Sequence, residues 1–342
     1  DRAEQYLKEA GMEVELYEGI EPDPSVETVM KGAAAMARFQ PDWIIAMGGG
    51  SPIDAAKAMW IKYEYPECTF EDMCKVFGLP KLRRKAHFCA VSSTSGTATE
   101  VTAFSIITDY SKGIKYPIAD FEITPDVAIV DPELAETMPK KLVAHTGMDA
   151  LTHAIEAALS KNANPLTDKD AYWAMQAIVQ NLPRAVANGQ DEAARTMMAY
   201  AENVAGMAFS NAGLGMVHAM AHALGGHYNL PHGVCNAVLL PYVLAFNSRS
   251  PVCRERFMTI AAAMGLQGTF TPDTAAPAVI QFVRQLSAGV GIPANLAQLN
   301  KVDPADFAAL AELALHDTCM STNQITPTRD EVVAVYTAAF RG

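Results

Sequence analysis

An acid and several histidines at helical spacing are the residues with the most evident chemistry in this sequence. Asp149 and His153 are four positions apart, so on a helix they lie on one face, one turn from each other. His218 and His222 repeat this spacing, and His232 follows between a proline and a glycine that are expected to fix a loop. Carboxylates and imidazoles are ligands that divalent transition metals accept. The pattern therefore predicts a metal site built from three separate segments.

The same residue types also allow plainer interpretations. An Asp/His pair at this spacing is often a surface pair, and a single histidine on an apolar helix is often a hydrogen-bonded core residue. His227 comes one position past the i+4 spacing from His222, which favours a place behind the metal ligands or on a cleft wall. Cys319 has no base beside it in the sequence, which favours a packed thiol over a nucleophile. The metal site is favoured over these interpretations because the acid and the histidines all lie in apolar, weakly charged parts of the sequence.

Two loops in the first half of the chain have the composition of a phosphate-binding crevice. The apolar run 42–47 ends in the glycine turn 48–51, and a helical pattern follows. Glycines let backbone amides approach a diphosphate, and a helix N-terminus favours negative charge. A second apolar run, 87–91, ends in the hydroxyl-rich run 92–100. Ligands bind at the carboxyl ends of strands in open α/β sheets, so the two loops are expected to line one crevice; ligand-free turns are the alternative.

The elements that position these residues follow the order of an α/β domain and then a helical one. Beyond Pro139, β-branched runs disappear and helical periodicity continues to the end. We expect residues 1–142 to form an α/β dinucleotide-binding domain with a parallel, Rossmann-like sheet, and residues 143–342 to form an all-α metal and substrate domain. A helix is expected over residues 1–10. Strand patterns lie at 12–17, 42–47, 87–91, 104–108, 115–119 and 127–130, and later helices at 167–182, 191–208, 215–224, 276–287, 303–314 and 328–340.

Length and composition exclude several classes of protein. At 342 residues, the chain is too long for one ordinary core. It has 26 Lys and Arg against 38 Asp and Glu, and a net charge of -12 is not attracted to nucleic acid or to anionic membranes. No apolar run reaches the roughly 18 residues of a membrane span. The six cysteines lack Cys-x-x-Cys spacing and are expected to be reduced thiols, which predicts a cytoplasmic protein.

Taken together, these motifs resemble the iron-containing (group III) alcohol dehydrogenases over essentially the whole chain. The resemblance is nearest to the short-chain alcohol, butanol and diol dehydrogenases and to lactaldehyde reductase, and aldehyde–alcohol dehydrogenase fusion proteins carry a similar domain. It rests on Gly48-Gly49-Gly50-Ser51-Pro52-x-Asp54, Ser95-Gly96-Thr97-x-x-Glu100-Val101, Gly147-x-Asp149-Ala150-Leu151-x-His153, and His218-x-x-x-His222 followed by Pro231-His232-Gly233.

The resemblance implies a role for each of these residues. His222 becomes an additional active-site histidine, and Phe209 and Cys319 fall at positions that line the substrate cleft. The implied metal ligands are Asp149, His153, His218 and His232. The expected ion is Fe(II), although this ligand set also accepts Zn, Co or Ni. The implied contacts to NAD or NADP are Gly49, Gly50, Ser51, Asp54, Ser93 (Thr in most of the family), Thr94, Thr97, Ile106 and Lys115.

The implied reaction is hydride transfer between a short primary alcohol or diol and a nicotinamide. The cation acts as a Lewis acid on the substrate oxygen, and His222 relays the alcohol proton. The expected partners are a small alcohol or aldehyde and further copies of the chain in a homodimer or larger assembly. Two alternatives stay open. A dehydroquinate-synthase-like lyase also binds NAD and a metal, but it needs Lys and Arg around the metal; a non-catalytic metal- or nucleotide-binding protein is the other.

The sequence departs from the family at its start. Family members begin with further strands before the helix that we expect over residues 1–10, so these strands are expected to be missing from the N-terminal domain. In the family, the residue that distinguishes NAD from NADP lies in that segment, and it is a carboxylate where NAD is preferred. The choice between NAD and NADP therefore stays open.

Overall fold

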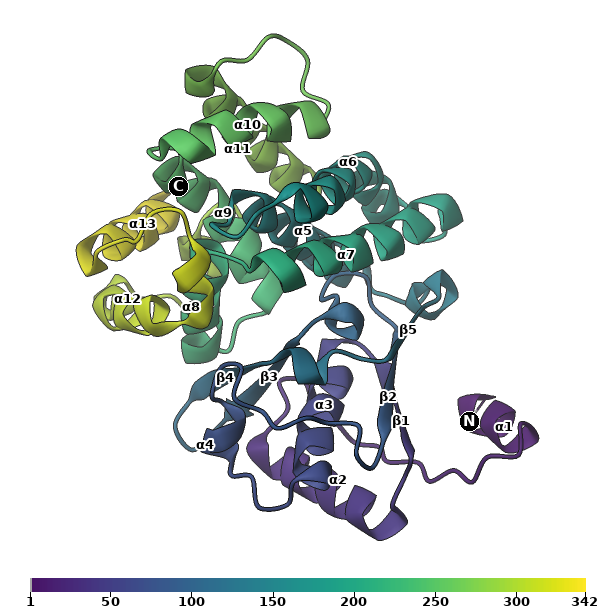
Figure 1. Ribbon diagram of the computed structural model, residues 1–342. Helices are drawn as coiled ribbons and strands as arrows, with labels where there is room; N and C mark the ends of the chain where they lie inside the picture. The colour runs from purple at the N-terminus through teal and green to yellow at the C-terminus, as the bar shows by residue number, and fades with distance from the viewer. Residues whose placement is uncertain (1) are drawn as a thin grey trace.

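The computed structural model describes residues 2–342 and shows an α/β half below a helical half (Figure 1). Residue 1, where the first predicted helix and domain begin, lies outside the described residues. A parallel sheet in the first half and packed helices in the second confirm the predicted fold class. The change from β-branched runs to helical periodicity after Pro139 coincides with the start of helix α5 (Lys140–Leu159). The domain division at 142/143 stays a prediction.

The α/β half is built on a three-stranded parallel sheet in the order β1-β2-β5. Its elements are β1 (Trp43–Gly48), β2 (His87–Ser92), β5 (Val127–Val130), α2 (Val26–Phe39) and α3 (Gly50–Glu64). Helix α3 packs on β1 and α2 packs beside α3, so Ile44 and Phe88 are buried under them. The register pairs Gly48 with Ser92, so β1 and β2 end side by side. The glycine turn and the hydroxyl-rich run therefore begin next to each other, as the strand argument predicted.

A two-stranded antiparallel hairpin packs against the same helix α3. It consists of β3 (Phe104–Asp109) and β4 (Ile114–Ala119), which confirms two of the predicted strands. Short elements complete this half: α1 (Arg2–Glu9), α4 (Phe70–Met73), and the 3-10 helices η1 (Thr99–Val101), η2 (Phe121–Ile123) and η3 (Pro132–Ala135).

The predicted strand over residues 12–17 is wrong, because this segment is irregular in the structure. A strand needs a neighbour for its backbone N–H and C=O groups, and no described strand pairs with this one. Its apolar side chains Met12, Leu16 and Tyr17 are exposed. Alternation of apolar and polar residues alone therefore does not make a strand here.

The second half packs eight further helices and three short 3-10 helices around α5. They are α6 (Pro165–Ala187), α7 (Glu192–Ala212), α8 (Met216–Tyr228), α9 (His232–Asn247), α10 (Pro251–Ala263), α11 (Pro272–Gly289), α12 (Phe307–His316), α13 (Arg329–Arg341), η4 (Leu296–Leu299), η5 (Pro304–Asp306) and η6 (Thr318–Thr322). Helix α5 contacts α6, α7 and α9 and is buried from residue 146 to 159. The list of predicted helices lacks α5, α9 and α10, although a helix through Asp149 and His153 is assumed from their spacing. Helix α9 is buried on nearly every side, so its sequence has no polar face to reveal a helical period.

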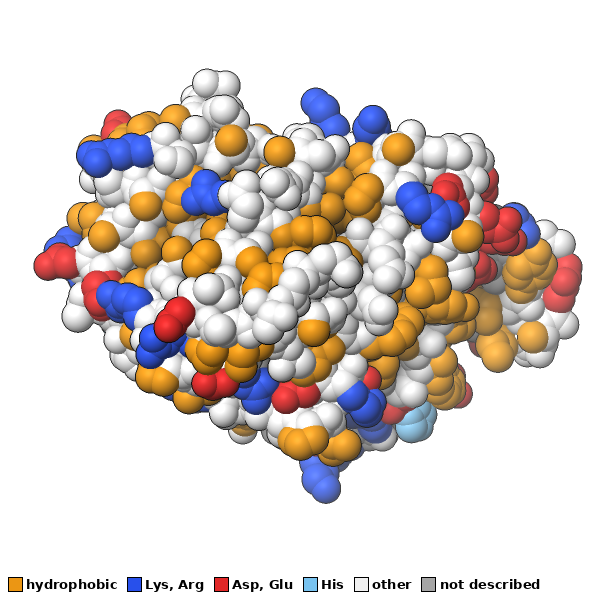
Figure 2. Space-filling model, turned by 90° about the horizontal axis from the view of Figure 1, so that it is seen from above, with side chains coloured by type: hydrophobic (Ala, Val, Ile, Leu, Met, Phe, Trp, Pro, Cys, Tyr) orange, Lys and Arg blue, Asp and Glu red, His pale blue; other side chains and the backbone are white. Residues whose placement is uncertain are grey.

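None of the described helices combines the length and the apolar character that a membrane crossing requires. On the face shown in Figure 2, the basic side chains are scattered among apolar and acidic ones rather than gathered in a continuous patch.

Helix α7 fastens the loop after β2 to the helical half. The Glu202 carboxylate accepts a hydrogen bond from the Ala98 backbone N–H at 2.7 Å, and Asn203 donates to Glu100 at 2.8 Å. A Cβ atom at Gly206 would lie 2.3 Å from the Cβ of Ala98, so the helix and the loop are in closest contact there. The loop is therefore held by α7 rather than by its own strand alone.

We predict that Gly206→Ala destabilises the protein. The added methyl group must displace Ala98, and overpacking of this kind costs roughly 1–3 kcal/mol, more than the gain of about 1 kcal/mol in helix propensity. Urea denaturation measures the free energy of unfolding. Gly189→Ala is the matched control, because a Cβ atom there meets nothing within 4 Å. Equal stability of the two variants would contradict the proposed contact.

Candidate functional site

Four side chains from three helices converge in the helical half. Asp149 and His153 come from successive turns of α5, His218 from the first turn of α8, and His232 is the first residue of α9. One potential ligand atom from each lies within 4.8 Å of the others. His232 was expected in a loop, but it begins a helix whose N-cap is Pro231. The structure thus brings together the four residues that the sequence singled out as metal ligands.

The electrostatics of this cluster suit a divalent cation. Burial raises the pKa of the Asp149 carboxyl, and it lowers the pKa of His153 to about 4 and that of His232 to about 3. Burial also holds the pKa of His218 well below its usual range. The imidazoles are therefore neutral at pH 7 and have lone pairs to offer, as metal ligands must.

Asn236, one turn after His232, marks the point on which the donor atoms converge. Its amide nitrogen lies 2.6 Å from Asp149 Oδ1 and 3.0 Å from both His218 Nε2 and His232 Nε2. His153 Nδ1 is buried and makes no hydrogen bond of normal geometry with the described residues, although the backbone of Gly96 approaches the ring. A set of donors that converges in this way fits a cation.

Glu156 supports the cluster and was not among the residues singled out from the sequence. Its Oε2 lies 2.6 Å from His218 Nδ1, and its Oε1 accepts from the Val217 backbone N–H at 2.7 Å. A cation on Nε2 requires the proton of the imidazole to be on Nδ1, where Glu156 accepts it. Burial raises the pKa of Glu156 to about 8, and the backbone donors oppose that rise. Its position seven residues after Asp149, on the same helical face, was the available signal.

Three of the residues expected to line the cleft lie at or near the edge of the cluster. The Phe209 ring stacks on His153 with centroids 4.3 Å apart. The His222 ring stacks on His232 at 5.2 Å, and its Nδ1 lies 2.8 Å from Asp317 Oδ2. Cys319 is 8% exposed, and its backbone N–H donates to the other oxygen of Asp317.

His227 is not part of this group. It lies five residues after His222 on α8, so its side chain points about 140° away around the helix. Its ring pairs with Asp306 at 3.3 Å, and the side chain is 43% exposed. The structure therefore places the His227 ring away from the four-residue cluster, and its predicted place on the cleft wall stays a prediction.

The two loops predicted to hold a diphosphate face each other. Gly49 and Gly50 lie opposite Thr94 and Thr97, where Cβ atoms on the glycines would come within 3.0 and 3.1 Å of the threonine methyl groups. The hydroxyls of both threonines are buried and have no hydrogen-bond partner among the described residues. Helix α3 begins at the same place, so its N-terminal amides are also available. Free hydroxyls beside a helix N-terminus fit an anionic phosphate group.

The other predicted cofactor residues surround these loops. Asp54 points inward: its carboxylate accepts from Thr99 Oγ1 at 2.5 Å and from the Ile106 backbone N–H at 3.0 Å. It therefore fastens the loop to the hairpin. Lys115 forms an ion pair with Asp23 at 2.6 Å, and its charge contributes to the lowered pKa of His232.

Two smaller contacts complete the crevice. The Ser93 backbone N–H donates to Gly48 at 2.8 Å, which joins the two loops. The Ser51 hydroxyl accepts from the backbone N–H of Asp23 at 3.2 Å. Asp23 thus contacts the crevice twice, through Ser51 and Lys115. Sequence reasoning passed over it because it lies in the irregular segment before α2.

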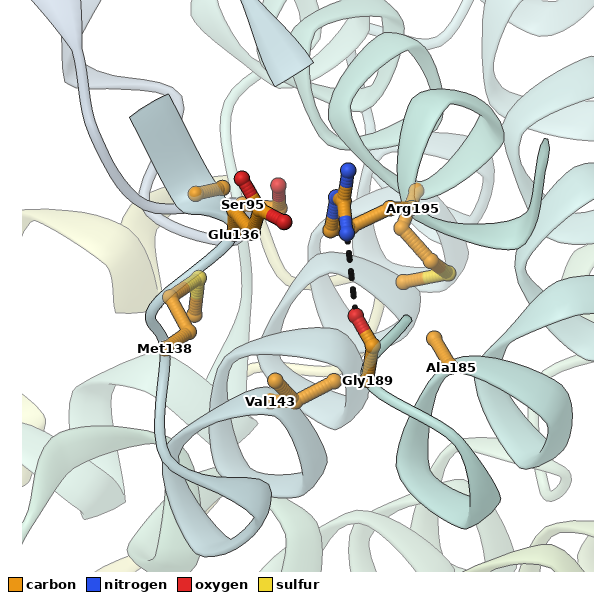
Figure 3. A pocket seen from close by; sticks show the side chains of 9 residues that line it. Ser95, Glu136, Met138, Val143, Ala185, Gly189 and Arg195 are labelled. Carbon is orange, nitrogen blue, oxygen red and sulfur yellow. Dashed lines mark hydrogen bonds between the residues drawn. The ribbon is translucent and has the colours of Figure 1, made fainter. Parts of the chain in front are cut away.

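A separate pocket lies on the other side of the hydroxyl-rich loop (Figure 3). Ser95, Glu136 and Arg195 point into it, and Arg195 donates to the carbonyl of Gly189 at 3.0 Å. Its enclosed volume of about 20 Å³ has room for one or two water molecules. It contains none of the predicted site residues and is too small for a cofactor.

A pair of loops that fits a phosphate group, beside a buried carboxylate–imidazole cluster that fits a cation, is typical of one class of protein, the nucleotide-linked enzymes that use a metal. Sequence comparison narrows this class. The family profile described as iron-containing alcohol dehydrogenase matches residues 1–132, and that of the C-terminal region of the Fe-containing alcohol dehydrogenase family matches residues 143–340. The chain belongs to the iron-containing alcohol dehydrogenase family. It is a metal-dependent, NAD(P)-linked oxidoreductase of alcohols and aldehydes.

Individual relatives agree with this assignment. The chain is 52% identical to the NADPH-dependent butanol dehydrogenase of Clostridium saccharobutylicum, over 100% of the chain and 88% of the relative. It is 43% identical to the 1,3-propanediol dehydrogenase of Klebsiella pneumoniae, over 99% and 87%. The crystal structure of a 1,3-propanediol oxidoreductase superposes with a TM-score of 0.93 at 42% identity, over 99% and 87%. The chain also matches 41% of the bifunctional aldehyde-alcohol dehydrogenase AdhE of Escherichia coli K12, at 38% identity.

We predict that Glu156→Gln weakens metal binding. His218 and Val217 donate to different oxygens of Glu156, and glutamine replaces one of these oxygens with an NH2 group that cannot accept. Loss of such a supporting carboxylate typically lowers metal affinity 10–100-fold. Calorimetric titration of the metal-free protein with Co²⁺ or Fe²⁺ measures the dissociation constant. Glu64→Gln is the control, since Glu64 is also a buried, hydrogen-bonded glutamate but lies in α3. Unchanged affinity in Glu156→Gln would contradict the role of Glu156.

Proposed function

We propose that this enzyme interconverts short primary alcohols or diols and their aldehydes, with Fe(II) held by Asp149, His153, His218 and His232. The observation that carries the proposal is the convergence of these donors on one point, beside a loop whose backbone at Gly96 approaches His153. When bound, the cation supplies a Lewis acid that polarises the substrate oxygen.

The loops position the nicotinamide cofactor relative to this point. We infer that the hydroxyls of Thr94 and Thr97 donate to the diphosphate, and that Gly49, Gly50 and Ser51 bring backbone amides to it. Ser93 and Ile106 lie on the adjoining loop and hairpin, and Asp54 holds those two elements together through Thr99 and Ile106. Lys115 reaches from the hairpin towards the helical half, where a ribose hydroxyl is the natural partner for its ammonium group.

His222 is the proposed proton relay. Its Nδ1 faces the Asp317 carboxylate, which accepts a hydrogen bond from Nδ1–H and so leaves the lone pair of Nε2 for the substrate proton. Asp317 is the residue that selects this tautomer. The pair resembles the histidine–carboxylate units of other acid–base catalysts in its geometry, and proton transfer of this kind typically contributes 10²–10⁴-fold to a rate.

Short, uncharged substrates suit the walls of the site. Phe209 closes one side by stacking on His153, and buried Cys319 lies on the side of His222. Phe209 is apolar, and the Cys319 thiol is uncharged at pH 7 because burial holds its pKa well above its usual range. The names of the relatives, butanol and 1,3-propanediol dehydrogenases, point to the same substrate class. The lyase alternative, which needs cationic groups for a phosphate-bearing substrate, is not supported by this lining.

We further propose that the protein works in the cytoplasm as a homodimer or larger assembly. All six cysteines are free in the structure, which suits a reducing compartment. The proposal of a homodimer or larger assembly rests on the resemblance to enzymes that assemble in this way. Light scattering coupled to size-exclusion chromatography measures the assembly directly.

The test is a steady-state screen of short alcohols and aldehydes with NAD(H) and NADP(H), using protein loaded with Fe(II) or Zn(II). We expect turnover by the Fe(II)-loaded protein that is lost on chelation. His232→Ala should lose bound metal and roughly a thousandfold in kcat/KM, because the Lewis acid contributes several kcal/mol. His316→Ala, which replaces an exposed histidine bonded to the Glu312 carbonyl, is the control. Full metal content and activity in His232→Ala would overturn the assignment.

A further inference from the structure

A second set of potential metal ligands lies beside the first and shares no residue with it. His222, Asp317 and Cys319 each offer one donor atom, and these atoms lie within 4.8 Å of one another. The imidazole comes from α8, Asp317 joins α12 to η6, and Cys319 lies in η6. All three are largely buried, with side-chain exposures of 13% for His222 and 9% for Asp317.

We propose that His222, Asp317 and Cys319 form a second cation site, selective for thiophilic ions such as Zn²⁺, and that its occupation inhibits the enzyme. Nitrogen, oxygen and sulfur donors in one set are typical of Zn²⁺ sites, and three protein ligands leave a coordination position for water. The four-residue cluster offers no sulfur. The two sites should therefore differ in metal preference, with iron accepted at the first and Zn²⁺ or Cd²⁺ favoured at the second.

The local charges favour a cation at this place. On binding, the Cys319 thiol releases its proton to solvent and the sulfur becomes a ligand as the thiolate. The thiolate and the Asp317 carboxylate together neutralise a divalent ion. The first centre has one carboxylate and carries a net charge of about +1 when loaded. A neutral unit beside it adds little repulsion, so both sites can be filled together.

The inhibitory effect follows from the tautomer of His222, and this part of the inference depends on the proposed proton relay. The nitrogen that faces Asp317 is Nδ1. A cation on Nδ1 takes that lone pair, so the imidazole proton moves to Nε2, the nitrogen left for the substrate. The base is then blocked, although the His222 side chain stays in place. No oxidation or reduction is involved.

The test uses the iron-loaded enzyme and adds Zn²⁺ beyond one equivalent. Equilibrium dialysis with metal analysis counts both metals, and the rate is measured on the same samples. We expect a second ion to bind without loss of iron and activity to fall in parallel. Cys319→Ser should weaken Zn²⁺ binding and inhibition at least tenfold, whereas Cys253→Ser, a buried cysteine in α10, should behave as the unaltered enzyme.

A spectroscopic measurement separates this site from the proposed enzymatic activity. Cd²⁺ bound to a thiolate absorbs in the ultraviolet, so titration of the iron-loaded protein should produce this band in the unaltered protein and in Cys253→Ser but not in Cys319→Ser. Asp317→Asn should weaken the Cd²⁺ band without removing the sulfur. These readouts do not require turnover, so they hold even if no alcohol is oxidised. Inhibition that releases iron one-for-one, or equal inhibition of both cysteine variants, would overturn the second site.

Discussion

The carboxylate of Asp149 is a charge inside the protein, only 2% exposed, and the arrangement of the helical half follows from the need to balance it. Burying an ion without a partner costs several kcal/mol. The imidazoles around it are neutral, and the dipole of the Asn236 amide is its shortest contact. A divalent cation supplies the missing charge, so binding of the metal and stability of the fold are linked.

The helices reach this carboxylate only because their backbones approach closely. A Cβ atom at Gly233 would lie 2.4 Å from the carbonyl oxygen of His145, so the first turn of α9 rests directly on α5. This contact brings His232 to Asp149. Asn229 ends α8 in the left-handed conformation, which lets the chain turn from α8 into α9 within a few residues. Gly233 and Asn229, which look like ordinary loop residues in the sequence, thus determine the distance between the ligands.

The sequence anticipated what depends on spacing within one element and missed what depends on contacts between elements. The Asp149/His153 face and the glycine turn are local patterns, and the structure contains both. The strand predicted over residues 12–17 fails because pairing is not local. Glu156 and Asn236 were missed for a related reason, because each matters through an atom of another helix. For Glu156 the only local signal was its place on the helical face of Asp149. The direction of His227 could have been read from its spacing, since five residues turn it away from His222.

Two of the three histidines of α8, His218 and His222, show how one local design gives two functions. His218 and His222 are one turn apart, and each has a carboxylate on Nδ1, from Glu156 and Asp317 respectively. Both rings therefore present Nε2 as the free nitrogen. The two histidines differ in burial. His218 is buried against the donor atoms around Asp149, whereas His222 is partly exposed and faces the Asp317 carboxylate, which also accepts from the Cys319 backbone N–H. The same helical turn thus provides His218 as a ligand to one centre and His222 as a base, which a cation bound with Asp317 and Cys319 would block.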